Sequence, residues 1–158
     1  MHTATKPQTT VRALNPQDLE AVVAIDAAIV GRVRKAYFMR RLSSALNQPD
    51  LHVQLAAVDA QGLAGYILAR RTQGEFGRVQ PGLRLEVLGV QADRQGRGVG
   101  RSLVRALATY ASSHGITELR TVAAWNNHRM LGWLDAMGFE LAPDLVVECS
   151  IGEGYQAE

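Results

Sequence analysis

Apolar residues in the N-terminal part of the chain recur with the period of a helix. After a short strand-like run at residues 9–14, Asn15 and Pro16 form a typical helix start, and apolar positions follow at helical spacing as far as Gly31. A second stretch with this spacing covers residues 35–46. The pattern therefore predicts one strand followed by two helices.

The middle of the chain has the alternating pattern of β-strands. Residues 52–58 and 64–69 are strand-like, and residues 59–62 between them have the composition of a hairpin turn. Residues 83–88 alternate in the same way, whereas residues 70–82 carry three glycines and a proline and are expected to form a loop. An antiparallel sheet is therefore predicted in this part of the chain.

Strands and helices alternate in the last third of the chain. A helix is predicted over residues 102–114, a strand over 119–124, a helix over 128–137 and an extended run over 145–151. Together with the antiparallel middle, this order predicts a mixed sheet of the α/β or α+β class.

Length and composition fit one globular domain. The chain has 158 residues, of which 47% are apolar and 20% charged. Because no repeat, low-complexity tract or linker marks a boundary, we expect a disordered tail at residues 1–8 and a single domain at residues 9–158. No run approaches the roughly 18 apolar residues of a membrane span, and the N-terminus lacks the apolar core of a signal peptide. Neither a secreted nor an integral membrane protein is expected.

Cysteine and histidine usage predicts a cytoplasmic protein without a structural metal. The single cysteine, Cys149, cannot form an intrachain disulfide, and the four histidines have no zinc-type spacing. A buried structural thiol is the expectation for Cys149.

The basic residues are mostly arginine, but the balance of charge is nearly neutral. Fifteen of the 17 basic residues are arginine, and the formal net charge is only +2. Arginine favours phosphate and carboxylate groups, so this usage fits a phosphorylated ligand, and it fits compositional bias equally well. A nucleic-acid-binding module is not expected, because no surface of interleaved aromatic and basic residues is evident.

A glycine-rich turn follows the strand at residues 83–88 and opens the next helix. Unpaired amides at a helix start carry the positive end of the helix dipole and can hold an anion such as a pyrophosphate, and glycines let the ligand approach them. The turn is neither a Walker A loop nor a dinucleotide fingerprint, because Arg101 stands where the third glycine of the fingerprint is required. Glycine spacing alone also fits a flexible connection without a ligand.

Two motifs in the correct order resemble those of the GNAT superfamily of N-acetyltransferases. Gln95-x-x-Gly98-x-Gly100 resembles the family's acyl-CoA pyrophosphate loop, Q/R-x-x-G-x-G/A, and Asn127 begins a stretch ending in Gly138-Phe139 that is similar to the family's segment after its fifth strand. The resemblance covers roughly residues 9 to 151. It implies a mixed, mostly antiparallel central sheet flanked by helices, with the fourth and fifth strands splayed apart.

The resemblance implies acetyl-CoA as cosubstrate, bound along the fourth strand and the glycine turn. The pantetheine arm would pair with the backbone of the fourth strand, and the pyrophosphate would lie on the amides of the turn. Gly89 gives independent support, because a glycine inside a β-rich run marks a bulge or a close backbone approach. The residues assigned to the cosubstrate are Leu88, Gly89, Val90, Gln95, Gly96, Arg97, Gly98, Val99, Gly100, Arg101, Ser102 and Asn127.

The implied reaction is direct attack of a primary amine, on a small molecule or at a protein lysine or N-terminus, on the acetyl thioester. An ammonium group is not a nucleophile, so the site must remove a proton from the acceptor. Glu86 is the only carboxylate on the strand before the turn, and family members often hold a glutamate there as base. Strand alternation places Glu86 on the face opposite to Leu85 and Val87. A solvent-facing glutamate paired with an arginine is the alternative interpretation.

The sequence departs from the family at the residue that commonly protonates the leaving thiolate. Leu134 occupies the position of that tyrosine, and the candidates to replace it are Tyr37, Tyr66, Tyr110 and His128. This departure leaves open a second hypothesis, a catalytically idle CoA-binding domain that acts as a sensor or docking module. A homodimer is possible, with residues 145–151 either as an interface strand or as an internal strand.

The acceptor is expected to lie against the first two helices and their connection. Five basic residues in this region would repel polyamines and favour an acceptor that carries a carboxylate or phosphate, unless they only form a solvated helix face. They are Arg32, Arg34, Lys35, Arg40 and Arg41.

Overall fold

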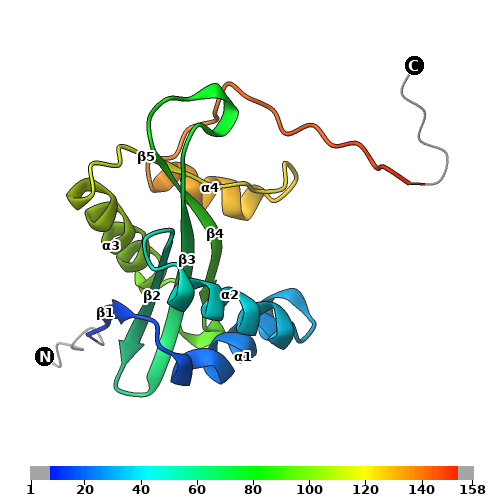
Figure 1. Cartoon of the computed structure of the whole chain (residues 1–158). Helices are drawn as coiled ribbons and strands as arrows, with labels where there is room; N and C mark the ends of the chain where they lie inside the picture. The colour runs from blue at the N-terminus through cyan, green and yellow to red at the C-terminus, as the bar shows by residue number, and fades with distance from the viewer. Residues whose placement is uncertain (1–7, 153–158) are drawn as a thin grey trace, which may run out of the picture. The chain divides into compact units, whose positions relative to one another are not determined.

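The computed structural model describes residues 8–152 of the chain (Figure 1). The chain divides into two compact units, with the boundary between Val122 and Ala123. The predicted tail lies outside the described residues except for its last residue, Gln8.

The first unit is built on a five-stranded sheet with the spatial order β1-β2-β3-β4-β5. The first four strands are antiparallel neighbours, and β5 runs parallel to β4. The predicted mixed, mostly antiparallel sheet is confirmed. The strands are β1 (Thr10–Ala13), β2 (His52–Asp59), β3 (Gly62–Thr72), β4 (Gly82–Val90) and β5 (Glu118–Arg120).

Helices cover both faces of this sheet (Figure 1). A Cβ atom at Gly65 of β3 would touch Val99 and Leu103, so this residue faces α3. The next residue, Tyr66, points to the other face and joins the core cluster of α1 and α2, which includes Val22 and Phe38. The helices are α1 (Leu19–Val30), α2 (Lys35–Asn47) and α3 (Val99–Ser113), with short 3₁₀ turns η1 (Pro16–Asp18), η2 (Glu75–Gly77) and η3 (Ala92–Arg94).

The helix start at Asn15 forms as predicted, through a complete set of capping hydrogen bonds. The Asn15 side chain accepts from the amide of Gln17 (3.0 Å), and Asp18 accepts from the amide of Asn15 (2.9 Å). Arg12 of β1 donates to both oxygens of Asp18 (2.7 and 2.9 Å), which fixes η1 to the edge strand. Hydrogen bonds from Arg12 hold the pKa of Asp18 below its usual range.

The second unit contains α4 (His128–Ala136) and then residues in neither helix nor strand. Asn127 caps α4 by accepting from the amide of Met130 (3.2 Å). The extended run predicted at residues 145–151 does not form a strand, because none of the described residues supplies a ladder partner for it. Its apolar side chains are exposed, and so is Cys149, contrary to the expected buried thiol.

Candidate functional site

A bulge in β4 determines where Glu86 points. Opposite β3, Leu68 pairs with Val87 and Ala69 pairs with Leu85, so Glu86 is an extra residue on β4. Glu86 reaches Arg41 of α2, and Val87 packs against the core of α1 and α2, so both lie on the same face of the sheet. The prediction that Glu86 and Val87 point to opposite faces is wrong, because the bulge interrupts the alternation.

Arg41 holds the Glu86 carboxylate at one of its two oxygens. Its Nε donates to Oε2 of Glu86 (2.8 Å), and its Nη2 donates to the carbonyl of Ala69 (2.9 Å). The Glu86 side chain is 22% exposed, and its Oε1 has no hydrogen-bond partner among residues 8–152. Glu86 is therefore paired with an arginine, as the alternative interpretation expected, but it lies against α2 with one oxygen available.

The C-terminal half of β4 presents an open backbone edge toward β5. The parallel ladder joins only Gly82–Arg84 to Glu118–Arg120, and within the described residues no strand pairs with this edge beyond it. The Thr121 hydroxyl still donates to the carbonyl of Leu85 (3.2 Å). The predicted splay of the fourth and fifth strands is confirmed, and it leaves the edge from Glu86 to Val90 without a strand partner among the described residues.

Gly89 lies in this segment, and the ring of Tyr66 explains why it is a glycine. A Cβ atom at Gly89 would lie 2.6 Å from Cε1 of Tyr66, whose side chain is fully buried. At Gly89 the sequence predicts either a bulge or a close backbone approach. The register shift falls at Glu86, and the close contact at the Cβ position of Gly89 is with a side chain of the core.

We expect Gly89→Ala to lower the free energy of unfolding by about 1–3 kcal/mol, because the added methyl group forces the buried ring of Tyr66 to shift. Urea denaturation measures the loss. In a double-mutant cycle, Tyr66→Leu should remove most of the cost of Gly89→Ala. An undiminished cost in the Tyr66→Leu background would show that the ring is not the cause.

The candidates for the missing acid lie in different surroundings. The Tyr66 hydroxyl is buried and has no hydrogen-bond partner among the described residues, and burial raises its pKa. Tyr110 stacks on His114, with ring centroids 4.0 Å apart, and Tyr37 packs edge-on against Phe38. Leu134, which replaces the family tyrosine, is buried in the second unit.

The glycine turn presents a row of free amides at the N-terminus of α3. Gly96 and Gly98 have φ angles of +76° and +84°, and a Cβ atom at either would meet nothing within 4 Å. The amides from Gly96 to Arg101 have no hydrogen-bond acceptor among residues 8–152, and the first amide bonded back into the turn is that of Ser102, to the carbonyl of Gly98 (3.0 Å). This arrangement can hold an anion.

Side chains of three predicted ligand residues are already engaged within the protein. The Gln95 amide group donates to the carbonyl of Val90 (3.2 Å), and the Ser102 hydroxyl donates to the carbonyl of Gly98 (2.9 Å). Asn127 belongs to the second unit, where it caps α4. Gln95 and Ser102 therefore shape the backbone of the turn.

Ion pairs neutralise most charges of α1, α2 and the bulge. The acidic residues of α1 and the glutamate of the bulge each form an ion pair with a basic side chain. The pairs are Glu20–Lys35, Asp26–Arg34 and Glu86–Arg41. Arg32 and Arg40 are exposed and have no acidic partner among the described residues. Of the five predicted basic residues, two therefore remain for a ligand.

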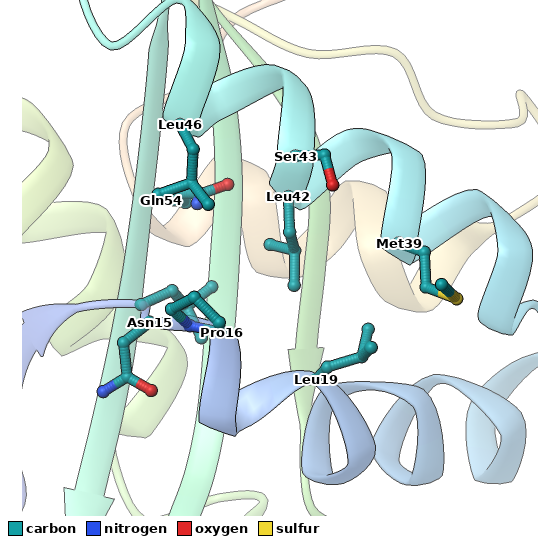
Figure 2. Close-up of a pocket in the computed structure, with 9 residues that line it drawn as sticks. Asn15, Pro16, Leu19, Met39, Leu42, Ser43, Leu46 and Gln54 are labelled. Carbon is teal, nitrogen blue, oxygen red and sulfur yellow. The ribbon is translucent and has the colours of Figure 1, made fainter.

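Another feature of α2 is an apolar pocket of about 150 Å³ (Figure 2). It lies between η1, α1, α2 and β2, and four leucines, Pro16 and Met39 supply its apolar lining. Gln54 contributes a polar group, and its Oε1 is buried without a partner among the described residues. Neither Glu86 nor the glycine turn lines this pocket, so it is separate from the predicted chemistry.

Two other features are absent from the described residues. None of the described helices is long and apolar enough to cross a membrane. Within residues 8–152, no three His, Cys, Asp or Glu residues are grouped as they would be to hold a metal ion.

Comparisons with known proteins agree with this fold. The model of the acetyltransferase (GNAT) family matches residues 19–139. The aminoglycoside N-acetyltransferase AAC(6')-Iy in complex with CoA is similar in structure, with a TM-score of 0.80 and 17% identity over 94% of this chain and 98% of that chain. No curated protein sequence matches the chain.

Two further solved structures are similar. A transcriptional regulator from Bacillus halodurans has a TM-score of 0.77 and 17% identity, over 91% of this chain and 100% of that chain. Glucosamine-6-phosphate N-acetyltransferase from Arabidopsis thaliana has a TM-score of 0.72 and 15% identity, over 90% of this chain and 98% of that chain. At these identities, the similarity establishes the fold.

Proposed function

Because the chain belongs to the acetyltransferase (GNAT) family, we propose that it transfers the acetyl group of acetyl-CoA to a primary amine. One observation carries the proposal: Glu86, with one oxygen free, lies on the strand whose open edge leads to the free amides of α3. The combination offers a base, a backbone edge and an anion site along one continuous segment, residues 86–101.

The chemical groups of acetyl-CoA match those that residues 86–101 offer. The pyrophosphate would accept from the amides between Gly96 and Arg101, and Arg97 and Arg101 would add positive charge. The pantetheine amides would pair with the open edge at Leu88, Gly89 and Val90, where the Val90 carbonyl already accepts from Gln95. The CoA complex of the similar aminoglycoside acetyltransferase supports CoA as the ligand. When bound, acetyl-CoA supplies an activated acetyl thioester.

Glu86 is the proposed base. The acceptor reaches the site as an ammonium ion, and its lone pair becomes available only after a proton leaves. Oε1 of Glu86 takes that proton directly or through one water molecule. Arg41 keeps the carboxylate in place through Oε2 and the Ala69 carbonyl, so its role is to position the base.

The charges around Glu86 favour an acceptor with a single amine and a neutral or anionic remainder. The acidic residues of α1, α2 and the bulge are paired, so no free carboxylate among these elements would bind a second ammonium group. Arg32 and Arg40 would repel a polycation. Aminoglycosides carry several amines, whereas an amino sugar phosphate carries one amine and an anion, so the second class is preferred.

The proposal is tested by acetyl-CoA-dependent thiol release with a panel of acceptors. The panel contains amino acids, amino sugar phosphates, lysine peptides, polyamines and aminoglycosides. We expect release with at least one monoamine and weaker release with polyamines. If no acceptor of the panel causes thiol release while CoA still binds, the result would favour the second hypothesis, a catalytically idle CoA-binding domain. The leucine at position 134 is the reason for keeping that hypothesis. No CoA binding would overturn both hypotheses.

A further inference from the structure

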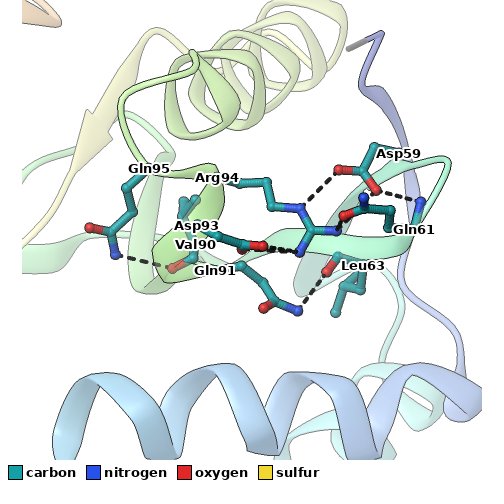
Figure 3. Close-up of polar contacts among 8 residues, drawn as sticks. All are labelled: Asp59, Gln61, Leu63, Val90, Gln91, Asp93, Arg94 and Gln95. Atoms are coloured by element: carbon teal, nitrogen blue, oxygen red, sulfur yellow. Dashed lines mark hydrogen bonds and ion pairs between the residues drawn. The ribbon is translucent and has the colours of Figure 1, made fainter.

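The segment just before the free amides is bound to the β2–β3 turn by a buried arginine (Figure 3). Arg94, the last residue of η3, donates from Nε to Oδ2 of Asp59 (3.0 Å) and from Nη2 to Oδ1 of Asp59 (3.3 Å). Nη2 also donates to Oε1 of Gln61 (2.7 Å). The Arg94 and Asp59 side chains are only 10% and 9% exposed, so this is a desolvated, two-pronged pair.

Further hydrogen bonds fix the same segment to the same hairpin. The Gln91 amide donates to the carbonyl of Ala64 (2.9 Å), and its side chain donates to the carbonyl of Leu63 (3.2 Å). Asp59 in turn accepts from the amide of Gln61 (2.8 Å), which fixes its carboxylate within the turn. Residues 91–94 are thus held at both ends, and the row of free amides begins two residues later.

We propose that Asp59 is a positioning residue for CoA, acting through Arg94 on the amides between Gly96 and Arg101. This inference rests on the proposed function. Within the turn, Gly96 and Gly98 have left-handed backbones, and a Cβ atom at either would meet nothing within 4 Å, so no packing at these two positions restrains the freedom of a glycine backbone. If such a segment became ordered only on binding, the loss of conformational entropy would weaken binding. A segment that is already fixed in the free protein avoids this entropy loss.

The hydrogen bonds between Asp59 and Arg94 are not part of the glycine motif of the turn. Asp59 and Arg94 are 35 residues apart, and neither belongs to the Q-x-x-G-x-G pattern. Asp59 does not itself contact the free amides, so its effect on a ligand must pass through Arg94. This separates it from the residues proposed to touch CoA.

Asp18 provides a matched control for Asp59. Each aspartate accepts two hydrogen bonds from one arginine and one from a nearby backbone amide, and each is about one-tenth exposed. Asp18, however, fixes η1 to β1, and none of its hydrogen bonds reaches the glycine turn. Asp59→Asn and Asp18→Asn should therefore both lower the stability of the protein, and only Asp59→Asn should change the binding of CoA.

The test compares wild type, Asp59→Asn and Asp18→Asn by calorimetric titration with CoA and by NMR order parameters of the turn amides in the ligand-free proteins. We expect Asp59→Asn to raise the Kd of CoA about tenfold or more and to lower the order parameters of residues 96–101. Asp18→Asn should leave both unchanged within about twofold. In turnover, Asp59→Asn should raise KM for acetyl-CoA with little change in kcat.

Gln61→Leu is the second variant, in case Asp59→Asn does not fold. It removes only the 2.7 Å hydrogen bond to Arg94 and should weaken CoA binding by a few fold. Wild-type Kd and order parameters in the folded variants would overturn the inference while leaving the proposed function intact. Absence of CoA binding by the wild type would instead overturn the proposed function.

Discussion

Glu86→Gln is expected to lower kcat by about 10²–10⁴-fold, the range that a positioned general base contributes. Glutamine has the same shape, and its amide oxygen can still accept from Nε of Arg41, so α2 and β4 stay together. What it lacks is a carboxylate oxygen that can take the proton of the acceptor ammonium. Steady-state kinetics with the best acceptor of the panel measures the effect, and the Kd of CoA should be unchanged.

Glu118→Gln is the control for this variant. Glu118 is also an ion-paired glutamate of the sheet, bound to Arg78 and Arg120, but it lies on β5 beside Gly82, before the strands splay. Its replacement should leave kcat within about twofold. Full turnover by folded Glu86→Gln would contradict the role of base and would leave Glu86 as the structural partner of Arg41.

Local signals in the sequence were sufficient for most of the fold. Asn15 and Pro16 marked the first helix, Gly31 ended it at φ +77°, and residues 59–62 formed the expected hairpin turn. These features depend on capping and on backbone freedom, which act within a few residues. The end of β5 and the missing C-terminal strand depend on which ladder partners exist, and no local pattern contains that information.

The site was predictable where a motif specified it and not where distant residues meet. The amides of the glycine turn lie at the helix start where the motif placed them. The bulge at Glu86 escaped detection because a shift of register between β3 and β4 leaves no mark on the pattern of either strand. The sequence marks Arg41 only as one of five basic residues near the first two helices. Its pairing with Glu86 could not be predicted, because the two residues are 45 positions apart.

Some predictions about the site and the protein's context concern features outside these observations. The single domain, the cytoplasmic location, the possible homodimer and the contact of Asn127 with the cosubstrate stay predictions. None of the described contacts bears on these four predictions. The glycine turn is different, because its exposed amides allow a direct test on the chain itself.

Gly98→Val is expected to abolish the thermal stabilisation of the protein by CoA. CoA at about 100 times its Kd should stabilise the wild type by about 2.7 kcal/mol. At Gly98, φ is +84° and nothing lies within 4 Å of the Cβ position, so a valine side chain would extend into open space beside the turn, where a bound ligand would lie. It would also disfavour the left-handed backbone that starts α3.

Gly115→Val is the control that distinguishes backbone strain from loss of CoA binding. Gly115 follows the other end of α3, with φ +67° and nothing within 4 Å of its Cβ position, so valine there imposes similar backbone strain. Both variants should melt at a lower temperature than the wild type, but only Gly98→Val should fail to respond to CoA. A normal CoA response in Gly98→Val would contradict the placement of the pyrophosphate on this turn, because a β-branched side chain and a strained backbone at Gly98 should both disturb the amides that start α3.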